Sequence, residues 1–199
     1  MRPALDATSR IEPVDHEALP AHGVAEAYLY LMATSCDACG KGPLRADEPD
    51  AATPPGGDAV LSLSVRCGAC GRDRVYTFAV PRGPTVARDA ALFEVNPTTE
   101  PSRILDVGQW IMLHLLHAES ARHESNKHEA RGMRLRAGQC LEEALKFYSD
   151  GDNDLPPPDA FFCESSRRRF RDHPERFSRR RIINLRRRLP TAARSDIER

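Results

Sequence analysis

The residues best suited to chemistry in this chain are four cysteines in two C-x-x-C pairs. The pairs are Cys36 with Cys39 and Cys67 with Cys70. Two intervening residues let one tight turn aim both sulfurs of a pair at a single ion, and a glycine after each pair allows the positive φ of such a turn. Four thiolates complete a tetrahedral shell and leave no position for water. We therefore predict one structural Zn²⁺ bound by these four residues.

Other roles for the four cysteines are less favoured by their context. Iron is an alternative occupant because it also accepts soft thiolate ligands, and a redox or metal-free role is a third possibility. Neither pair is predicted to lie between a strand and a following helix, which argues against thioredoxin-like redox chemistry. The 27 residues between Cys39 and Cys67 exceed the usual spacing of about 15 to 20 in such sites. A Pro- and Gly-rich loop at 46–58 accounts for the excess.

Apolar and polar residues alternate on both sides of the second cysteine pair. The alternation at 61–65 and at 76–80 predicts two strands that flank the turn as a hairpin. With the two pairs and their glycines, residues 34–80 resemble the zinc-ribbon group, which includes rubredoxin-like knuckles. The resemblance implies a small β fold and a bound metal. The whole chain is also similar to small zinc-ribbon proteins of GC-rich bacteria, and neither resemblance implies an activity.

These patterns predict an α+β protein, with a small zinc-ribbon β module followed by an α-helical C-terminal domain. The expected parts are a flexible arm at 1–22, a zinc ribbon at 23–84 with a mobile insert at 46–58, a connector at 85–103, and a helical domain at 104–199 with a basic C-terminal part. Prolines in the arm and in the insert are the reason for expecting little regular structure there. The apolar run at 24–32 is compatible with a short helix or a strand.

Helical periodicity predicts four helical elements in the last part of the chain. Asp106 can cap the first, and residues 110–116 are apolar on nearly every side, which predicts burial. The second carries an apolar stripe over residues 133–148. The third starts near Asp159, and the fourth runs from Pro174 to Leu189.

Histidines and glutamates gather around the end of the first of these helices. They are His114, His117, Glu119, His123, Glu124 and His128. On one continuous helix several of them would share a face and could bind a second metal or serve an enzyme. Ser125 and Asn126 instead suggest that the helix ends there, which favours a solvated turn. Cys140 and Cys163 are expected in the core, because free cysteine behaves as a small hydrophobe.

Charge is unevenly distributed, although the formal net charge is zero. Residues 160–199 contain 13 arginines and five acidic residues, so the preceding part is acidic. Arginine runs at 167–169, 179–181 and 186–188 could bind nucleic-acid phosphates. The favoured interpretation is that they coat the solvent face of the last helices or are paired within the fold. The charge could also be balanced across a homodimer. The candidate phosphate contacts are Arg168, Arg180 and Arg187, and the candidate internal partners are Asp150, Asp152, Asp154 and Asp159.

The favoured function is a non-enzymatic zinc-binding adaptor or scaffold whose helical half binds a protein partner. The sequence shows no HExxH, phosphate-binding loop, nucleophile elbow or dinucleotide fingerprint. One alternative is a nucleic-acid-binding protein that uses the arginine-rich C-terminal helices. A second alternative is an enzyme with a site near residues 114–128. No apolar run is long enough to span a membrane, and residues 1–20 lack the apolar core of a signal peptide. We expect a cytoplasmic protein, where thiols stay reduced.

Overall fold

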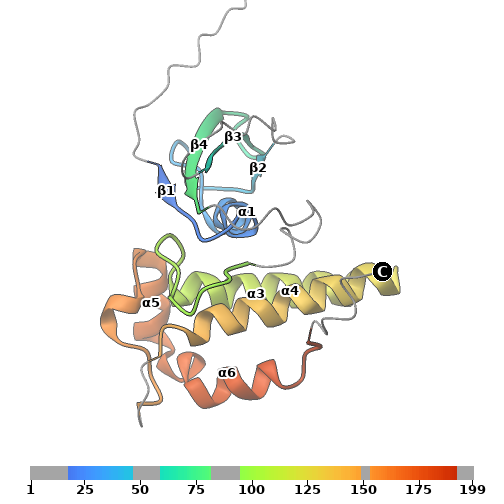
Figure 1. The fold of residues 1–199 in the computed structure, drawn as a ribbon, viewed down its shortest axis with the longest axis vertical. Helices are drawn as coiled ribbons and strands as arrows, with labels where there is room; N and C mark the ends of the chain where they lie inside the picture. Colours follow the sequence, from blue (N-terminus) through green and yellow to red (C-terminus); the bar gives the residue numbers. More distant parts are fainter. Residues whose placement is uncertain (1–17, 47–58, 82–94, 149–152, 192–199) are drawn as a thin grey trace, which may run out of the picture.

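The computed structural model describes residues 18–46, 59–81, 95–148 and 153–191. These residues form a four-stranded sheet with one helix beside it, and then a group of helices (Figure 1). Within the described ranges, every strand precedes residue 81 and the longer helices follow residue 106. The fold is therefore mixed α and β, in the order predicted.

The sheet has the order β1-β4-β3-β2. Its strands are β1 (Leu19–Pro20), β2 (Leu44–Ala46), β3 (Ala59–Cys67) and β4 (Asp73–Val80). β3 and β4 form the predicted antiparallel hairpin, and Leu63 pairs with Tyr76 in its register. β2 adds to β3 in antiparallel fashion, and β1 adds to β4 in parallel. Leu63, Val65 and Phe78 point into the core, which is what the alternation of apolar residues requires.

The undecided run at 24–32 is a helix, α1 (Val24–Ala33). It lies between the sheet and the helices below it (Figure 1). Tyr30 meets the rings of Tyr76 and Phe78 edge-on, with ring centroids 6.2 and 5.8 Å apart. Leu29 and Leu31 are buried as well. Because α1 is covered on more than one side, its apolar residues show no single stripe, and periodicity could not separate helix from strand.

The prediction of an irregular arm through residue 22 is wrong at its end. Leu19 and Pro20 form β1, and Ala21 donates its backbone N–H to the carbonyl of Ala79 at 3.0 Å. An edge strand tolerates Pro20, because its outer side needs no N–H donor. The remainder of the arm (1–17), nearly all of the predicted insert (47–58) and the start of the connector lie outside the described residues.

Two long helices dominate the C-terminal part. α3 (Val107–His123) and α4 (Lys127–Leu145) are joined by residues 124–126, so they lie antiparallel as a hairpin. The side chain of Asn126 accepts from the backbone N–H groups of His128 and Glu129 and caps α4. The predicted helix end near Ser125 and Asn126 is confirmed.

Shorter elements follow the hairpin. They are the 3₁₀ turns η1 (Pro158–Ala160) and η2 (Pro174–Phe177), and the helices α5 (Glu164–Asp172) and α6 (Arg179–Arg186). The single helix predicted from Pro174 to Leu189 is thus divided. Phe177 is buried against the rings of Phe161 and Phe170. Ser178 adopts an extended backbone and caps α6.

Asp106 caps α3 as predicted and also holds α5. Its Oδ1 accepts from the backbone N–H of Gln109 at 2.8 Å and from Ser166 Oγ at 2.7 Å. Its Oδ2 accepts from the N–H groups of Phe162 and Cys163, each at 2.9 Å. A Cβ on Gly108 would lie 2.5 Å from Ser166 Oγ, so only glycine permits this approach of α3 to α5. The carboxyl group is fully buried, and each of its oxygens accepts two hydrogen bonds.

The predicted burial of residues 110–116 holds for only part of them. Trp110 and Leu113 are buried, whereas Leu115 and Leu116 are 59% and 42% exposed. Among the described residues of α3 beyond His114, Ala121 alone is buried. That half of α3 is covered on the side facing α4 and little elsewhere, which leaves the two leucines in contact with solvent.

Candidate metal centre

The two C-x-x-C turns have the same backbone geometry. In the first, Gly40 donates its N–H to the carbonyl of Cys36 at 2.8 Å, and Cys36 donates to the carbonyl of Lys41 at 2.6 Å. In the second, Gly71 N–H donates to the carbonyl of Cys67 at 2.8 Å, and Cys67 N–H to that of Arg72 at 2.9 Å. The glycines have φ of 66° and 73°, a conformation in which any other residue is strained.

The sheet brings these turns face to face. The first turn connects α1 to β2, and the second connects β3 to β4. Leu44 of β2 is paired with Cys67, and Gly68 N–H donates to the carbonyl of Pro43 at 2.9 Å. The addition of β2 to the hairpin is therefore what places the first pair of cysteines opposite the second.

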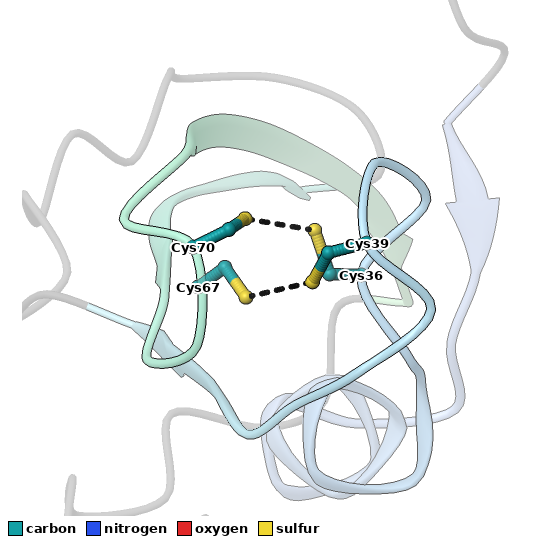
Figure 2. A group of neighbouring side chains, drawn as sticks. All are labelled: Cys36, Cys39, Cys67 and Cys70. Atoms are coloured by element: carbon teal, nitrogen blue, oxygen red, sulfur yellow. Dashed lines mark hydrogen bonds between the residues drawn. The ribbon is translucent and has the colours of Figure 1, made fainter.

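All four sulfurs converge on one point (Figure 2). Cys36 Sγ lies 3.8 Å from Cys70 Sγ, and Cys39 Sγ lies 3.7 Å from Cys67 Sγ. The four Sγ atoms lie within 4.8 Å of one another, and all four thiols are free. Sulfurs at the corners of a tetrahedron with Zn–S bonds of about 2.3 Å are separated by about 3.8 Å. The cluster therefore has the size and the donor set for one metal ion.

The ligands differ in exposure according to their place in each pair. Cys36 and Cys67, the first members, are 3% and 1% exposed and belong to the hydrophobic core. Cys39 is half-buried and Cys70 is exposed. An ion bound here would connect the core of the module to its two outer turns.

The turns stabilise negative charge on sulfur only in part. Backbone N–H groups of Cys70 and Ala69 lower the pKa of Cys67 to about 7. For Cys39 the N–H of Lys41 also favours the thiolate, but desolvation and the three neighbouring thiols outweigh it and raise the pKa to about 12. Four thiolates this close repel one another, so a cation is needed for all of them to ionise.

An ion pair supports the first turn from the adjoining strand. Arg74 of β4 donates from Nη2 to Asp37 Oδ2 at 2.7 Å. The hydrogen bond from Arg74 lowers the pKa of the Asp37 carboxyl. Asp37 immediately follows Cys36, so this contact ties the first turn to the hairpin that carries the second. The sequence contains no local signal for it, because the two residues are 37 positions apart.

The structure does not gather the histidine-rich segment into a site. His114 is buried and its Nδ1 lies 3.1 Å from the carbonyl of Ala137. Burial, reinforced by the charge of Arg136, lowers the pKa of His117 to about 4. His123 pairs with Glu119 at 2.9 Å on the solvent side. The remaining members, Glu124 and His128, belong to the turn after α3 and to the exposed start of α4.

The two other cysteines occupy different environments. Cys140 is fully buried in α4, as predicted, and burial raises the pKa of its thiol to about 12. Cys163 is only half-buried, contrary to the prediction, because it lies at the N-cap of α5, where its Sγ is 3.1 Å from Ser166 Oγ. Within the described ranges, the four clustered cysteines are the one group of three or more His, Cys, Asp or Glu residues at metal-binding separation.

Comparison of the chain with protein-family models, curated proteins and solved structures finds no match in any of the three. Of the helices in the described part, none is sufficiently long and apolar to cross a membrane. A function for this chain must therefore be inferred from its own geometry.

Proposed function

We propose that the four cysteines hold one zinc ion with a structural role. The observation that carries this proposal is the convergence of four free sulfurs at separations of 3.7 and 3.8 Å across the two turns. A closed set of four thiolates is typical of structural zinc, since catalytic zinc keeps a position for water or substrate. Iron fits the same donors, and metal analysis of the purified protein separates the two.

We further propose that the chain is a non-enzymatic adaptor, a rigid body that presents a surface to a protein partner. This proposal is supported by a hydrophobic core that runs without interruption from the sheet to the helices. Leu63 and Phe78 of the sheet, Leu31 of α1, and Trp110 and Leu141 of the hairpin belong to a single cluster of buried residues. The metal-holding turns and the helices would therefore keep a constant orientation. The metal would act on the whole body through the shared core.

A polar contact fastens the segment before α3 to the end of α4. Glu143 is 4% exposed, and its Oε1 and Oε2 lie 2.8 Å from Lys146 Nζ and 3.1 Å from Asn96 Nδ2. Burial raises its pKa to about 7, with Lys146 and Asn96 opposing the rise and Glu26 of α1 adding to it. Glu26 is itself fully buried and accepts from His22. Sequence reasoning missed both glutamates, because acidic residues in a helix are normally solvated.

The raised pKa of Glu143 predicts a pH-dependent stability. Unfolded glutamate titrates near 4.3, so between about pH 4.5 and 7 the unfolded chain has lost a proton that the folded chain keeps. The free energy of unfolding must therefore fall as pH rises through this window. Relative to Glu143→Gln, which cannot ionise, we expect the wild type to lose about 2 to 4 kcal/mol between pH 5 and 8. Urea denaturation of both zinc-loaded proteins measures this, and parallel stability curves would refute it.

The adaptor proposal also predicts where a partner binds. Leu115 and Leu116 are neighbours in sequence on the exposed half of α3. Exposed apolar surface can mark an interaction site, and we propose that these two leucines belong to one. In affinity purification from the native host, a partner retained by the wild type should be lost with Leu115→Ser/Leu116→Ser. It should be retained with Leu155→Ser, which alters another exposed leucine (43%).

Retention of the same proteins by the wild type and by the Leu115→Ser/Leu116→Ser variant would contradict this binding site. Recovery of no partner, together with turnover of a small molecule that depends on His117 or Glu124, would contradict the adaptor function and favour an enzyme instead. Zinc content, measured in parallel, shows that each variant is still folded around its metal.

A further inference from the structure

Four exposed arginines lie on one side of the last helix and of the turn that follows it. α6 continues in helical hydrogen bonding beyond Arg186, since Arg187 N–H donates to the carbonyl of Ile183 at 3.0 Å. With about 100° per residue, Arg180, Arg181, Arg187 and Arg188 fall within about 120° of the helix circumference. Ile182, 1% exposed, lies on the opposite side. We call the surface formed by these four arginines the α6 face.

The α6 face is hollowed. A depression of about 410 Å³ is lined by Ser178, Arg180, Arg181, Asn184, Leu185 and Arg188. Three arginines and an asparagine thus line one small volume together with Ser178 and Leu185. None of the described lining residues is aromatic.

The acidic residues near α6 are held mainly by other groups. Asp154 accepts from Ser178 Oγ and from the backbone N–H of Arg180, so it caps the helix. These two hydrogen bonds, with a smaller contribution from the charge of Arg180, lower the pKa of Asp154. Glu142 binds Arg186, which lies outside the α6 face, at 2.6 Å. Within residues 153–191 and the other described ranges, no acidic side chain pairs with the four guanidinium groups of the face. The predicted partners Asp150 and Asp152 lie outside the described residues.

We propose that the α6 face binds the phosphodiester backbone of duplex DNA. Arg180 and Arg188 are separated by about 12 Å along the helix axis. A strand of B-DNA presents a phosphate every 3.4 Å of axis, so the face matches about three to four phosphates. Guanidinium groups bind phosphate oxygens in bidentate fashion. Single-stranded nucleic acid is less suited, because its binding sites use aromatic side chains on which bases stack.

This binding goes beyond the adaptor function and does not depend on it. The contacts are to the backbone, so they are independent of base sequence and strongly dependent on salt. Each lost phosphate contact lowers the slope of log affinity against log salt by about 0.9. Four contacts predict a fall in affinity of about 150-fold between 50 and 200 mM salt.

The test is a salt series with the full-length, zinc-loaded chain and a 20-bp DNA duplex of mixed sequence. We expect Arg180→Ala/Arg181→Ala/Arg188→Ala to lower the salt slope by about 2.7. A matched control, Arg103→Ala/Arg122→Ala/Arg131→Ala, removes the same charge from exposed arginines elsewhere and should keep the wild-type slope. The corresponding triple lysine variant of the α6 face keeps its charge and should retain most of the slope.

Three outcomes would overturn the proposal. They are failure of the wild type to retain the duplex at 50 mM salt, equal slopes for the alanine triple and its control, and binding to an RNA duplex or an acidic protein but not to DNA. Zinc content and circular dichroism of each variant show whether the protein is folded. Failure of DNA binding with zinc still bound would leave the structural zinc and the adaptor function unaffected.

Discussion

Replacement of Cys67 by serine is expected to abolish metal binding and unfold the sheet. Cys67 is 1% exposed and lies where β3 ends, at the pairing with Leu44. In small modules, structural zinc contributes about 10 to 16 kcal/mol at pH 7. That is as large as the whole stability of an ordinary domain, about 5 to 15 kcal/mol. The β3–β4 hairpin cannot be expected to persist once this contribution is lost.

Metal analysis and hydrogen exchange measure this effect together. We expect one zinc per wild-type chain, none in Cys67→Ser, and loss of amide protection in β3 and β4. Cys163→Ser is the matched control, because Cys163 is a free cysteine outside the cluster and its loss should leave zinc content unchanged. A wild type that contains iron, or no metal with all thiols free, would contradict the zinc assignment. An intact hairpin in Cys67→Ser would contradict its structural role.

Asp106→Ala is expected to be the most destabilising substitution away from the metal. The buried carboxyl group accepts four hydrogen bonds, two on each oxygen. One comes from the first turn of α3, and three come from α5 and the two residues before it. Removal of a buried charged partner typically costs about 3 to 5 kcal/mol, since the donors left behind have no water to bind. Both the cap of α3 and the attachment of α5 would be lost at once.

Asn126→Ala provides the comparison for Asp106→Ala. Asn126 also caps a long helix, but it is exposed, so its loss should cost about 1 kcal/mol. Urea denaturation of the three zinc-loaded proteins gives the two differences in the free energy of unfolding. Equal costs for the two substitutions would mean that burial and the contacts with α5 contribute little.

Local patterns were sufficient where one stretch of chain contains the whole cause of a structure. The β3–β4 hairpin follows from alternation around the second cysteine pair, and the start of α3 follows from Asp106 and Gln109, which form a capping box. The end of α3 follows from polar residues around Asn126. The two C-x-x-C turns were likewise visible, because Gly40 and Gly71 directly follow their cysteines and adopt the positive φ expected there.

Local patterns failed where a distant part of the chain decides the environment. Pro20 is in a strand because β4 offers an edge, and α1 showed no clear period because it is covered on several sides. Leu115 and Leu116 have apolar side chains of the kind that are usually buried. Among the described residues, however, little covers that half of α3. The predicted helix from Pro174 to Leu189 is interrupted at Ser178, because Phe177 packs against the rings of Phe161 and Phe170.

The sequence by itself determined the donor set of the candidate site, the two turns that present it and the order of sheet before helices. Each of these depends on residues that are neighbours in the chain. Only the tertiary structure decided that all four sulfurs meet, since the pairing of β2 with β3 brings Cys36 and Cys39 to the second turn. It also separated the histidines into buried and solvated positions and, among the described residues, left the arginines of the α6 face without an ion pair. Burial and charge pairing depend on residues far apart in sequence, so no local pattern could reveal them.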